Sequence, residues 1–379
     1  MQIKPSFSNQ PISLNNQNIT LGISGGVDSS VSAHLLKKSD YQVNAVFMKN
    51  WVDLEGNGDC PIESDLTDAK QVCKNLDIPF NAINFAPEYW DHVFEHFLSE
   101  YRLGRTPNPD ILCNKEVKFK LFLNYAIDHG ADCIATGHYA RIHQTENGFQ
   151  LLKAKDLSKD QSYFLYTLNQ HQLSKSIFPL GDLLKTDVRL IAKENNIITH
   201  NKKDSTGICF IGERNFQDFL SQFIPTKTGE IQTADGKVLG EHQGVMYYTL
   251  GQRKGLGIGG KQQSLDEPWF VVGKNISENI LIVEQGHNHP LLLSDSLVAN
   301  DLHWISGEMP ELPYSCTAKT RYRQNDVKCI ITDQAQNGLT VKFENNQRAM
   351  TPGQSIVFYN GDVCLGGGII NKVANILFH

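Results

Sequence analysis

The segment with the clearest chemical meaning is Ser24-Gly25-Gly26-Val27-Asp28-Ser29-Ser30, which lies between an apolar run and an amphipathic stretch. Its glycines let the backbone turn tightly and approach a phosphate, while its hydroxyls and the free N–H groups of a helix N-terminus would bind the anion. It lacks the lysine of G-x-x-x-x-G-K-[ST] and the third glycine of the dinucleotide fingerprint. An isolated Ser-Gly-Gly could be only a capped turn, but this position favours an anion site.

Two of the eight cysteines have surroundings suited to sulfur chemistry. Cys113 follows two prolines and precedes a basic stretch, so we expect it near a helix start, where a thiol ionises more readily than a free one. Cys209 lies in a glycine-flanked loop over residues 202–212. No C-x-x-C pair occurs, so the spacing does not support a zinc site. We interpret the other six cysteines as small buried hydrophobes: Cys60, Cys73, Cys133, Cys316, Cys329 and Cys364.

The elements that must position these residues follow a regular alternation in the first half of the chain. The pattern predicts strands over 19–23, 41–48, 80–85 and 133–136, and helices over 27–38, 67–76, 88–101 and 116–129. Strands separated by such helices indicate βαβ units and a parallel sheet. After about residue 206 long helices disappear and turn signals such as Asp-Gly and Asn-Gly become frequent, which predicts mostly antiparallel β-structure.

These patterns divide the chain into four parts. We expect a flexible leader over 1–18, an α/β domain over 19–207, a small β-rich central domain over 208–285 and a C-terminal antiparallel β-barrel over 286–379. A chain of 379 residues that is 40% hydrophobic and 20% charged is neither disordered nor fibrous. Its net charge of −6 means that a nucleic-acid partner would be held by a local basic patch. No apolar run approaches the length of a membrane span, so we expect a cytoplasmic protein without a membrane partner.

The string S-G-G-x-D-S-S resembles the pyrophosphate loop (PP-loop) of the ATP pyrophosphatases, which cleave ATP between the α- and β-phosphates and activate an oxygen as its adenylate. Together with six further motifs, the sequence is similar to the bacterial tRNA-specific 2-thiouridylases (MnmA type). The motifs are NPDILCNKEVKF at 108–119, ATGHYAR at 135–141, KDQSYFL at 159–165, DSTGICFIG at 204–212, GQRKGLGIGG at 251–260 and RYRQ at 321–324. The resemblance implies an adenine-nucleotide α-hydrolase-like N-terminal domain.

The resemblance also implies the reaction. The wobble uridine of tRNAs with Lys, Glu or Gln type anticodons would exchange its C2 oxygen for sulfur, using ATP and, with it, Mg²⁺, and giving 2-thiouridine, AMP and diphosphate. Cys209 would carry the sulfur as a persulfide, Cys113 would be the nucleophile, and Asp110 is a candidate acid/base that could equally be a turn residue. The two thiols would end as a disulfide. A persulfide carrier or cysteine desulfurase system would supply sulfur. We expect a monomer, although the sequence itself does not fix the oligomeric state.

By the same resemblance, two groups of residues would bind ligands. The nucleotide would contact residues around the first strand and its neighbours: Gly22, Ile23, Ser24, Gly25, Gly26, Val27, Asp28, Ser29, Met48 and Gly137. The tRNA would contact residues of four motifs and one glutamine outside them: Asn108, Pro109, Asp110, His138, Lys159, Asp160, Gln161, Arg321, Tyr322 and Gln354. The run over 319–323 alternates cations with an aromatic residue on an expected strand, so its charges could share one face, but a solvated edge strand would have the same pattern.

Two alternatives remain open at this point. An ATP pyrophosphatase that adenylates a small metabolite would explain the phosphate loop but would give Cys113 and Cys209 no role. A non-catalytic tRNA-binding protein would not need the intact loop. In a thiolating enzyme, ATP cleavage or product formation would depend on tRNA and on both thiols. In the two alternatives it would not.

Overall fold

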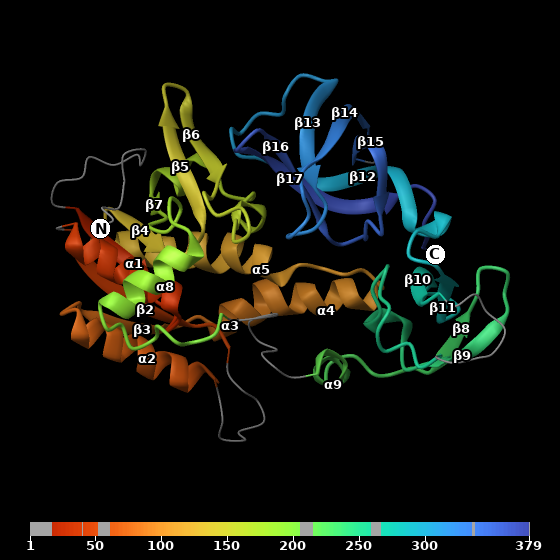
Figure 1. Cartoon of the computed structure of the whole chain (residues 1–379), viewed down its shortest axis with the longest axis horizontal. Coiled ribbons are helices and arrows are strands. Elements are labelled where there is room, and N and C mark those ends of the chain that lie inside the picture. The colour runs from red at the N-terminus through yellow and green to blue at the C-terminus, as the bar shows by residue number, and fades with distance from the viewer. Residues whose placement is uncertain are drawn as a thin grey trace.

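The computed structural model describes residues 17–39, 41–51, 61–204, 215–258, 267–335 and 338–378. It contains an α/β domain, a small β-rich domain and a β-barrel, which lie at the left, lower right and upper right of Figure 1. The predicted fold class is therefore confirmed. Residues 1–16 of the expected leader, Cys60 and Cys209 lie outside the described residues.

The N-terminal sheet consists of parallel strands in the order β3-β2-β1-β4-β7. These strands are β1 (Asn18–Gly22), β2 (Gln42–Lys49), β3 (Phe80–Asn84), β4 (Cys133–Thr136) and β7 (Ser176–Ile177). The strand order reverses between β1 and β4, and ligands of open α/β sheets bind outside the carboxyl ends of strands at such a switch point. Gly22, the last residue of β1, pairs with Thr136, the last residue of β4, and on its other side with Val46 of β2, which continues to Lys49.

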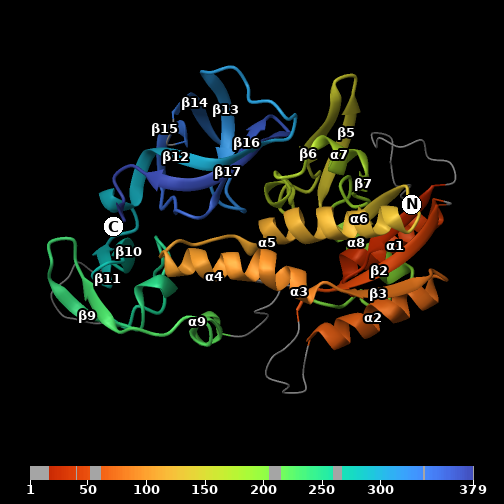
Figure 2. The ribbon, with the colours of Figure 1, turned by 180° about the vertical axis from the view of Figure 1, so that it is seen from behind.

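Helices cover both faces of this sheet. One face packs against α1 (Val27–Lys38), α2 (Pro61–Asn75) and α8 (Lys185–Glu194). The other packs against two helical rods that cross the middle of the molecule (Figure 2). The first rod comprises α3 (Ala86–Tyr89), the π-helix η1 (Trp90–Phe94) and α4 (Glu95–Arg102), and the second comprises α5 (Pro109–Leu112), the π-helix η2 (Cys113–Phe122) and α6 (Leu123–Asp128). Alternation along β2 produces these two cores, because Ala45 and Val46 face opposite sides.

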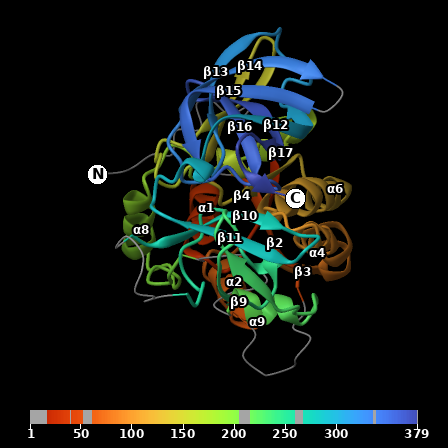
Figure 3. The same ribbon diagram turned by 90° about the vertical axis from the view of Figure 1, so that its right-hand side faces the viewer.

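The central domain is a sheet in the order β18-β10-β11-β8-β9. It contains α9 (Phe216–Ser221), β8 (Gly229–Gln232), β9 (Val238–His242), the 3-10 turn η4 (Val245–Tyr247), β10 (Trp269–Asn275), β11 (Ile280–Gln285) and, from the end of the chain, β18 (Leu377–Phe378). Aromatic rings join this domain to the first rod, since the rings of Phe94 and Phe219 lie 6.0 Å apart. In side view the central sheet lies below the barrel (Figure 3).

Six antiparallel strands close the C-terminal barrel, because β12 pairs with both β15 and β17. They are β12 (Leu293–Trp304), β13 (Tyr314–Lys319), β14 (Val327–Ala335), β15 (Gly338–Arg348), β16 (Ser355–Asn360) and β17 (Val363–Val373). A hairpin of the N-terminal half, β5 (Ala140–Thr145) and β6 (Gly148–Lys153), extends this sheet by pairing β6 with β17. The short elements η3 (Ser162–Phe164), α7 (Gln170–Ser174) and η5 (Pro290–Leu292) complete the described structure.

Candidate active site

The loop after β1 is shaped for an anion. Gly25 has a φ of +75°, and a Cβ there would lie 2.2 Å from the Asp65 carbonyl oxygen, so only glycine fits. The Ser24 N–H donates to Ser29 Oγ at 3.1 Å, and the Ser29 hydroxyl donates to the Gly26 carbonyl. Gly26 is the N-cap of α1 and supplies no capping side chain, which leaves the helix N-terminus to an external acceptor.

The residues expected around adenosine lie close together at the carboxyl ends of the strands. A Cβ on Gly22 would lie 3.0 Å from Met48 Cε and 3.3 Å from the Phe122 ring, and one on Gly137 would lie 2.9 Å from the Ser29 nitrogen. The Ile23 N–H donates to the Val46 carbonyl oxygen at 3.0 Å. The side chains of Met48 and Phe122 thus pack over Gly22, and Gly137 lies against the backbone at the start of α1, so neither position has room for a side chain. Phe122, which sequence reasoning missed, brings η2 against this point.

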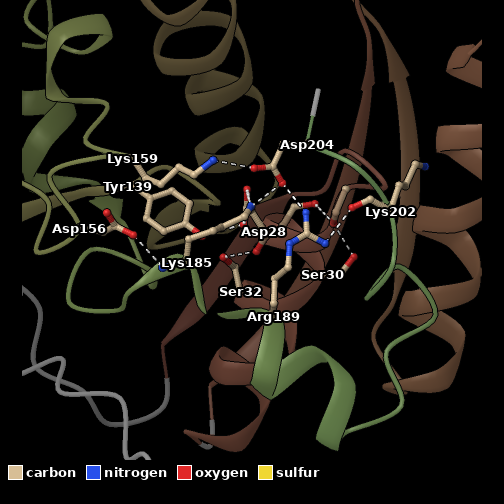
Figure 4. A network of polar contacts seen from close by, with 12 residues as sticks. Asp28, Ser30, Ser32, Tyr139, Asp156, Lys159, Lys185, Arg189, Lys202 and Asp204 are labelled. Atoms are coloured by element: carbon tan, nitrogen blue, oxygen red, sulfur yellow. Dashed lines mark hydrogen bonds and ion pairs between the residues drawn. The ribbon is translucent and has the colours of Figure 1, made fainter. Parts of the chain in front are cut away.

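Asp28, in the first turn of α1, has two polar partners from distant segments (Figure 4). The Lys185 ammonium, at the start of α8, lies 2.7 and 2.8 Å from its carboxylate oxygens, and the Tyr139 hydroxyl donates to it at 2.8 Å. The same ammonium lies 2.8 Å from Asp204 Oδ1. The carboxylate of Asp28 and burial both raise the pKa of Tyr139, burial contributing more, so this phenol remains a donor.

Asp204 forms ion pairs with three cationic side chains. Lys159 Nζ lies 2.8 Å from one carboxylate oxygen, while Lys185 and Arg189 lie 2.8 and 2.6 Å from the other (Figure 4). Partial burial opposes ionisation of Asp204, but the hydrogen bonds from Lys159 and Lys185 hold its pKa well below the ordinary value. We name Asp28, Lys159, Lys185, Arg189 and Asp204 the loop network. Sequence reasoning missed Lys185, Arg189 and the role of Asp204, because their spacing in the chain carries no signal.

A second lysine approaches the loop from the other side. Lys202 Nζ donates to the Gly25 carbonyl oxygen at 3.1 Å and pairs with Asp65 at 2.7 Å and with Asp68. These carboxylates belong to α2, so Lys202 ties that helix to the loop. The loop therefore has a cation on each flank.

The second rod carries Asp110 and Cys113 one turn apart. Asn108 caps its start by accepting from the Asp110 N–H at 3.2 Å, and Pro109 occupies the first helical position. Cys113 is thus a full turn inside the helix, later than the expected position near its start, and its side chain is buried. Burial raises the pKa of Asp110, and nearby Lys118 opposes that rise. The rod continues as a ten-residue π-helix, a form enriched at functional sites.

His138 is a buried neutral imidazole. Its Nδ1 lies 2.7 Å from the Thr136 hydroxyl, and its ring packs near those of Phe119 and Phe178. Burial, followed by the charge of Lys118, lowers its pKa well below the ordinary value. The residue as a whole is 8% exposed, so a tRNA contact would have to use its narrow exposed edge or its backbone.

The three expected tRNA contacts in the turn over 159–161 point to different surroundings. The side chain of Lys159 is one-third exposed, whereas Asp160 is buried and accepts from the Ala154 N–H at 3.0 Å and the Ser162 hydroxyl at 2.9 Å. Gln161 Oε1 accepts from the Tyr139 N–H at 2.9 Å. Of these three residues, Lys159 presents a charged group to solvent.

Asp160 belongs to a second group of paired charges, which joins the N-terminal half to the barrel. Lys319 Nζ lies 3.3 Å from Asp160 and 3.7 Å from Asp326, and Asp326 also pairs with Lys153. Both ammonium groups lie over the Tyr359 ring, at 4.5 Å for Lys153 and 5.2 Å for Lys319. We name Lys153, Asp160, Lys319 and Asp326 the barrel network.

The expected tRNA contacts of the barrel also have partners within the protein. Arg321 donates to the Ala349 carbonyl, and the Tyr322 ring lies 4.3 Å from that of Phe164. Gln354 donates to the Thr106 carbonyl oxygen at 2.7 Å, which places the barrel against the segment that leads to Asn108. The strand expected over 319–323 is wrong, because β13 ends at Lys319 and a turn follows. Lys319 itself is buried in the barrel network, so these cations do not share one face.

The remaining cysteines that the structure describes fit a packing role. Cys73, Cys133, Cys329 and Cys364 are buried, and Cys316 is half-buried. Burial raises the pKa of Cys73 to about 11 and, with Asp132, that of Cys133 to about 12, which keeps both thiols protonated. The described residues contain no group of three or more His, Cys, Asp or Glu side chains that could hold a metal ion. No helix among them combines the length and apolar character that crossing a membrane requires.

Comparisons with known proteins cover all three domains of the chain. Family models match residues 17–213 (tRNA methyl transferase HUP domain), 217–285 (tRNA methyl transferase PRC-barrel domain) and 294–370 (aminomethyltransferase beta-barrel domain). The tRNA-specific 2-thiouridylase MnmA of Francisella philomiragia is 57% identical over 358 residues, which is 94% of this chain and 100% of the relative. The MnmA of Proteus mirabilis is 57% identical over 353 residues, 93% of this chain and 96% of the relative.

Proposed function

The chain belongs to the tRNA-specific 2-thiouridylase family, and from this premise we propose that it replaces the C2 oxygen of the wobble uridine of tRNA with sulfur. The tRNAs would be those with Lys, Glu or Gln type anticodons, and the products 2-thiouridine, AMP and diphosphate. The observation that carries the proposal is the convergence of an anion-binding loop and the Cys113 rod, because Phe122 of that rod packs on Gly22 of β1.

The loop would hold ATP for the first step. Carbonyl oxygen is a poor leaving group, so the uridine O2 attacks the α-phosphorus, diphosphate departs, and AMP becomes the leaving group of the next step. The N-terminus of α1 and the serine hydroxyls would bind phosphate, and the carboxyl ends of the strands beside Gly22 and Gly137 would receive adenosine. Mg²⁺ would enter with ATP and neutralise phosphate charge; the partly exposed Asp28 carboxylate is the class of ligand that it prefers.

Sulfur would reach C2 through two cysteines. Cys209 carries the sulfur as a persulfide received from a carrier protein or a cysteine desulfurase system. Either the terminal sulfur attacks C2 and Cys113 then attacks Cys209 Sγ, or Cys113 attacks first and releases sulfide, which attacks C2. In both routes AMP leaves and a Cys113–Cys209 disulfide forms, which two electrons from an external thiol reductant restore.

Asp110 would handle the proton of the uracil ring. Loss of the N3 proton makes O2 a better nucleophile, and the same proton returns when the thiocarbonyl forms. A carboxylate whose pKa is raised by burial is a stronger base than an exposed one. Its position one turn before Cys113 would put the base and the nucleophile on the same helix.

The tRNA would present an uridine extruded from the anticodon loop, because C2 is inaccessible within the base stack. Asn108, Pro109 and Asp110 would meet that base. Lys159, which offers a partly exposed ammonium, would contact a phosphate. Residues with internal partners would instead contribute backbone or exposed edges: His138, Asp160, Gln161, Arg321, Tyr322 and Gln354.

Reconstitution tests the proposal. Purified protein, ATP, Mg²⁺, unmodified tRNA and a persulfide donor (cysteine with a cysteine desulfurase) are incubated, and the nucleosides are analysed for 2-thiouridine. Cys113→Ser, Cys209→Ser and Asp110→Asn should lose nearly all thiolation. When sodium sulfide replaces the persulfide donor, both cysteine variants should be partly rescued, because free sulfide bypasses the persulfide and the thiol that cleaves it, whereas Asp110→Asn should not be rescued. Cys73→Ala, at a buried cysteine of α2, is the matched control and should retain activity.

The outcomes separate the alternatives. ATP cleavage that does not need tRNA would indicate a metabolite-adenylating enzyme, and tRNA binding without ATP cleavage would indicate a binding protein. Full thiolation by Cys113→Ser with the persulfide donor would refute its role, and an unchanged single-turnover rate in Asp110→Asn would remove that carboxyl from the mechanism.

A further inference from the structure

Two cysteines of the barrel face each other across neighbouring strands. Cys316 of β13 is paired in register with Cys329 of β14, and their sulfur atoms lie 3.6 Å apart. Both are free thiols. Directly opposed residues of antiparallel strands have Cα atoms about 4.5–5.5 Å apart, which lies within the range that a disulfide spans. The two strands therefore already have the separation that a bond between these sulfur atoms requires.

The two thiols differ in their access to solvent. Cys329 is 3% exposed and packs with Ile331 and Phe343 in the barrel core, whereas Cys316 is half-buried. A small oxidant therefore reaches Cys316 first. The hydrogen bond with Cys316, followed by burial, raises the pKa of Cys329 far above the ordinary value. Modification of Cys316 removes the larger of these two causes, so Cys329 ionises more readily once its partner has reacted.

The pair lies at the base of a hairpin whose turn carries two expected tRNA contacts. Residues 320–326 join β13 to β14, and they include Arg321 and Tyr322. Because Cys316 and Cys329 are 13 positions apart, a bond between them would enclose the whole turn in a covalent ring. Such a ring restricts the conformations that the strands and the turn adopt when they open.

We propose that Cys316 and Cys329 form a redox-active dithiol, which low-molecular-weight disulfides such as oxidised glutathione convert into an intramolecular disulfide that constrains the β13–β14 hairpin. The Cys316 thiolate attacks one sulfur of the small disulfide, so that a mixed disulfide forms and one small thiol leaves. Cys329 then loses its proton and attacks Cys316 Sγ, which releases the second small thiol. The two cysteines lose two electrons and two protons, and the small disulfide gains them as two thiols. The reaction uses neither Cys113 nor Cys209, and the proposal does not depend on the proposed function.

The test treats the reduced full-length protein with oxidised glutathione, without tRNA or ATP, and maps its cysteines by mass spectrometry after N-ethylmaleimide has blocked the remaining thiols. Trypsin cleaves after Lys319 and Lys328, so the two cysteines fall in different peptides that a disulfide would join. The joined peptides should appear at least about tenfold faster than glutathione adducts at Cys73 or Cys364, because buried thiols react only when the fold opens.

Single variants test the order of attack. Cys329→Ala should stop at a stable mixed disulfide on Cys316, seen as one added glutathione. Cys316→Ser should leave Cys329 unmodified over the same time, because the buried thiol then has no accessible partner. Cys364→Ala, at another buried cysteine of the barrel, is the matched control and should form the joined peptides at the wild-type rate.

Hydrogen exchange of the reduced and oxidised protein measures the constraint on the hairpin. Oxidation should slow amide exchange in β13 and β14 by about tenfold or more, because the ring removes open conformations, and should change exchange in β2 by less than about twofold. The same treatment of Cys316→Ser should leave both regions unchanged.

Each other outcome overturns the inference. A wild-type protein that retains a mixed disulfide on Cys316 would show that Cys329 does not reach it. Joined peptides that form no faster than the adducts at Cys73 and Cys364 would indicate a reaction of the unfolded chain. If both thiols stay free, packing is their role. Unchanged exchange in β13 and β14 of the oxidised protein would refute the constraint on the hairpin.

Discussion

The loop network and the barrel network contain the same ion-pair chemistry in different surroundings. In the barrel network the Lys153 and Lys319 side chains are 8% and 9% exposed and that of Asp160 is 1% exposed, while Asp326, at 28%, is its most exposed member. In the loop network the side chains other than Lys185 are about one-third exposed. Partners that water can solvate exchange at low cost, whereas buried partners do not. Burial, rather than the residue types, therefore distinguishes a site that can bind anions from a joint that fixes two domains.

The boundary between the two networks runs through one motif. Lys159 belongs to the loop network and its neighbour Asp160 to the barrel network. The turn thus connects the nucleotide site to the barrel, and a rigid Asp160 fixes the position of Lys159. The next experiments test this comparison.

The largest effect is expected where a buried pair is broken. Lys319→Met leaves Asp160 buried without its cation, which costs about 3–5 kcal/mol of stability. Native-state hydrogen exchange of the barrel strands should report this loss. The double variant Lys319→Met with Asp160→Asn should recover part of it, because no unpaired charge remains.

The matched control lies in the same barrel. Lys328 and Glu344 form a pair at 3.6 Å whose side chains are 78% and 60% exposed. Lys328→Met should cost less than about 1 kcal/mol, as exposed pairs do. Equal effects of Lys328→Met and Lys319→Met would mean that burial does not distinguish the two kinds of pair.

Lys274 of the central domain is a third case, a buried lysine whose Nζ donates to the Gly104 carbonyl oxygen at 2.7 Å. Burial lowers the pKa of Lys274 to about 7, while its unfolded value is about 10.4. Between these values the unfolded chain binds a proton that the folded chain has released, so stability rises with pH, by up to about 1.4 kcal/mol per pH unit.

Urea unfolding at pH 7, 8 and 9 measures this slope. The free energy of unfolding of wild type, relative to that of Lys274→Met, should rise by about 1–3 kcal/mol over the two units. Lys237→Met, at an exposed lysine of the same domain, should keep the wild-type slope. A slope that survives in Lys274→Met would assign the proton release to another group.

The sequence could predict those features of the fold and the site that depend on residues adjacent in the chain. The alternation of strands and helices located α1 and β4 to the residue, and the loop over 24–30 could be recognised because its chemistry lies in seven consecutive positions. The β5–β6 hairpin could not be assigned to the barrel sheet, because its pairing with β17 joins Leu152 to Val363. Lys185 was missed for the same reason, since its contact with Asp28 exists only after folding.

Local sequence patterns gave wrong predictions for charged residues that the fold buries. The cations over 319–323 suggested an exposed strand, but Lys319 enters the barrel network and the strand ends there. Asp160 follows Lys159 in the motif and was grouped with it, yet its carboxylate faces inward. Charge alone cannot indicate which of two adjacent polar residues a fold will bury.

The smallest effect is expected in the loop network. Asp204→Asn should lower the free energy of unfolding at pH 7 by no more than about 1 kcal/mol, because water screens its one-third exposed pairs. The pKa of Asp204 is held below its ordinary value by Lys159 and Lys185, so this stabilisation is present above the unfolded value of about 3.9 and is lost as pH falls through the folded value. Urea unfolding at pH 7 and at lower pH should therefore show wild type and variant converging in acid. A loss at pH 7 as large as that of Lys319→Met would show that Asp204 is a fixed structural partner of these cations and that exposure does not weaken its pairs.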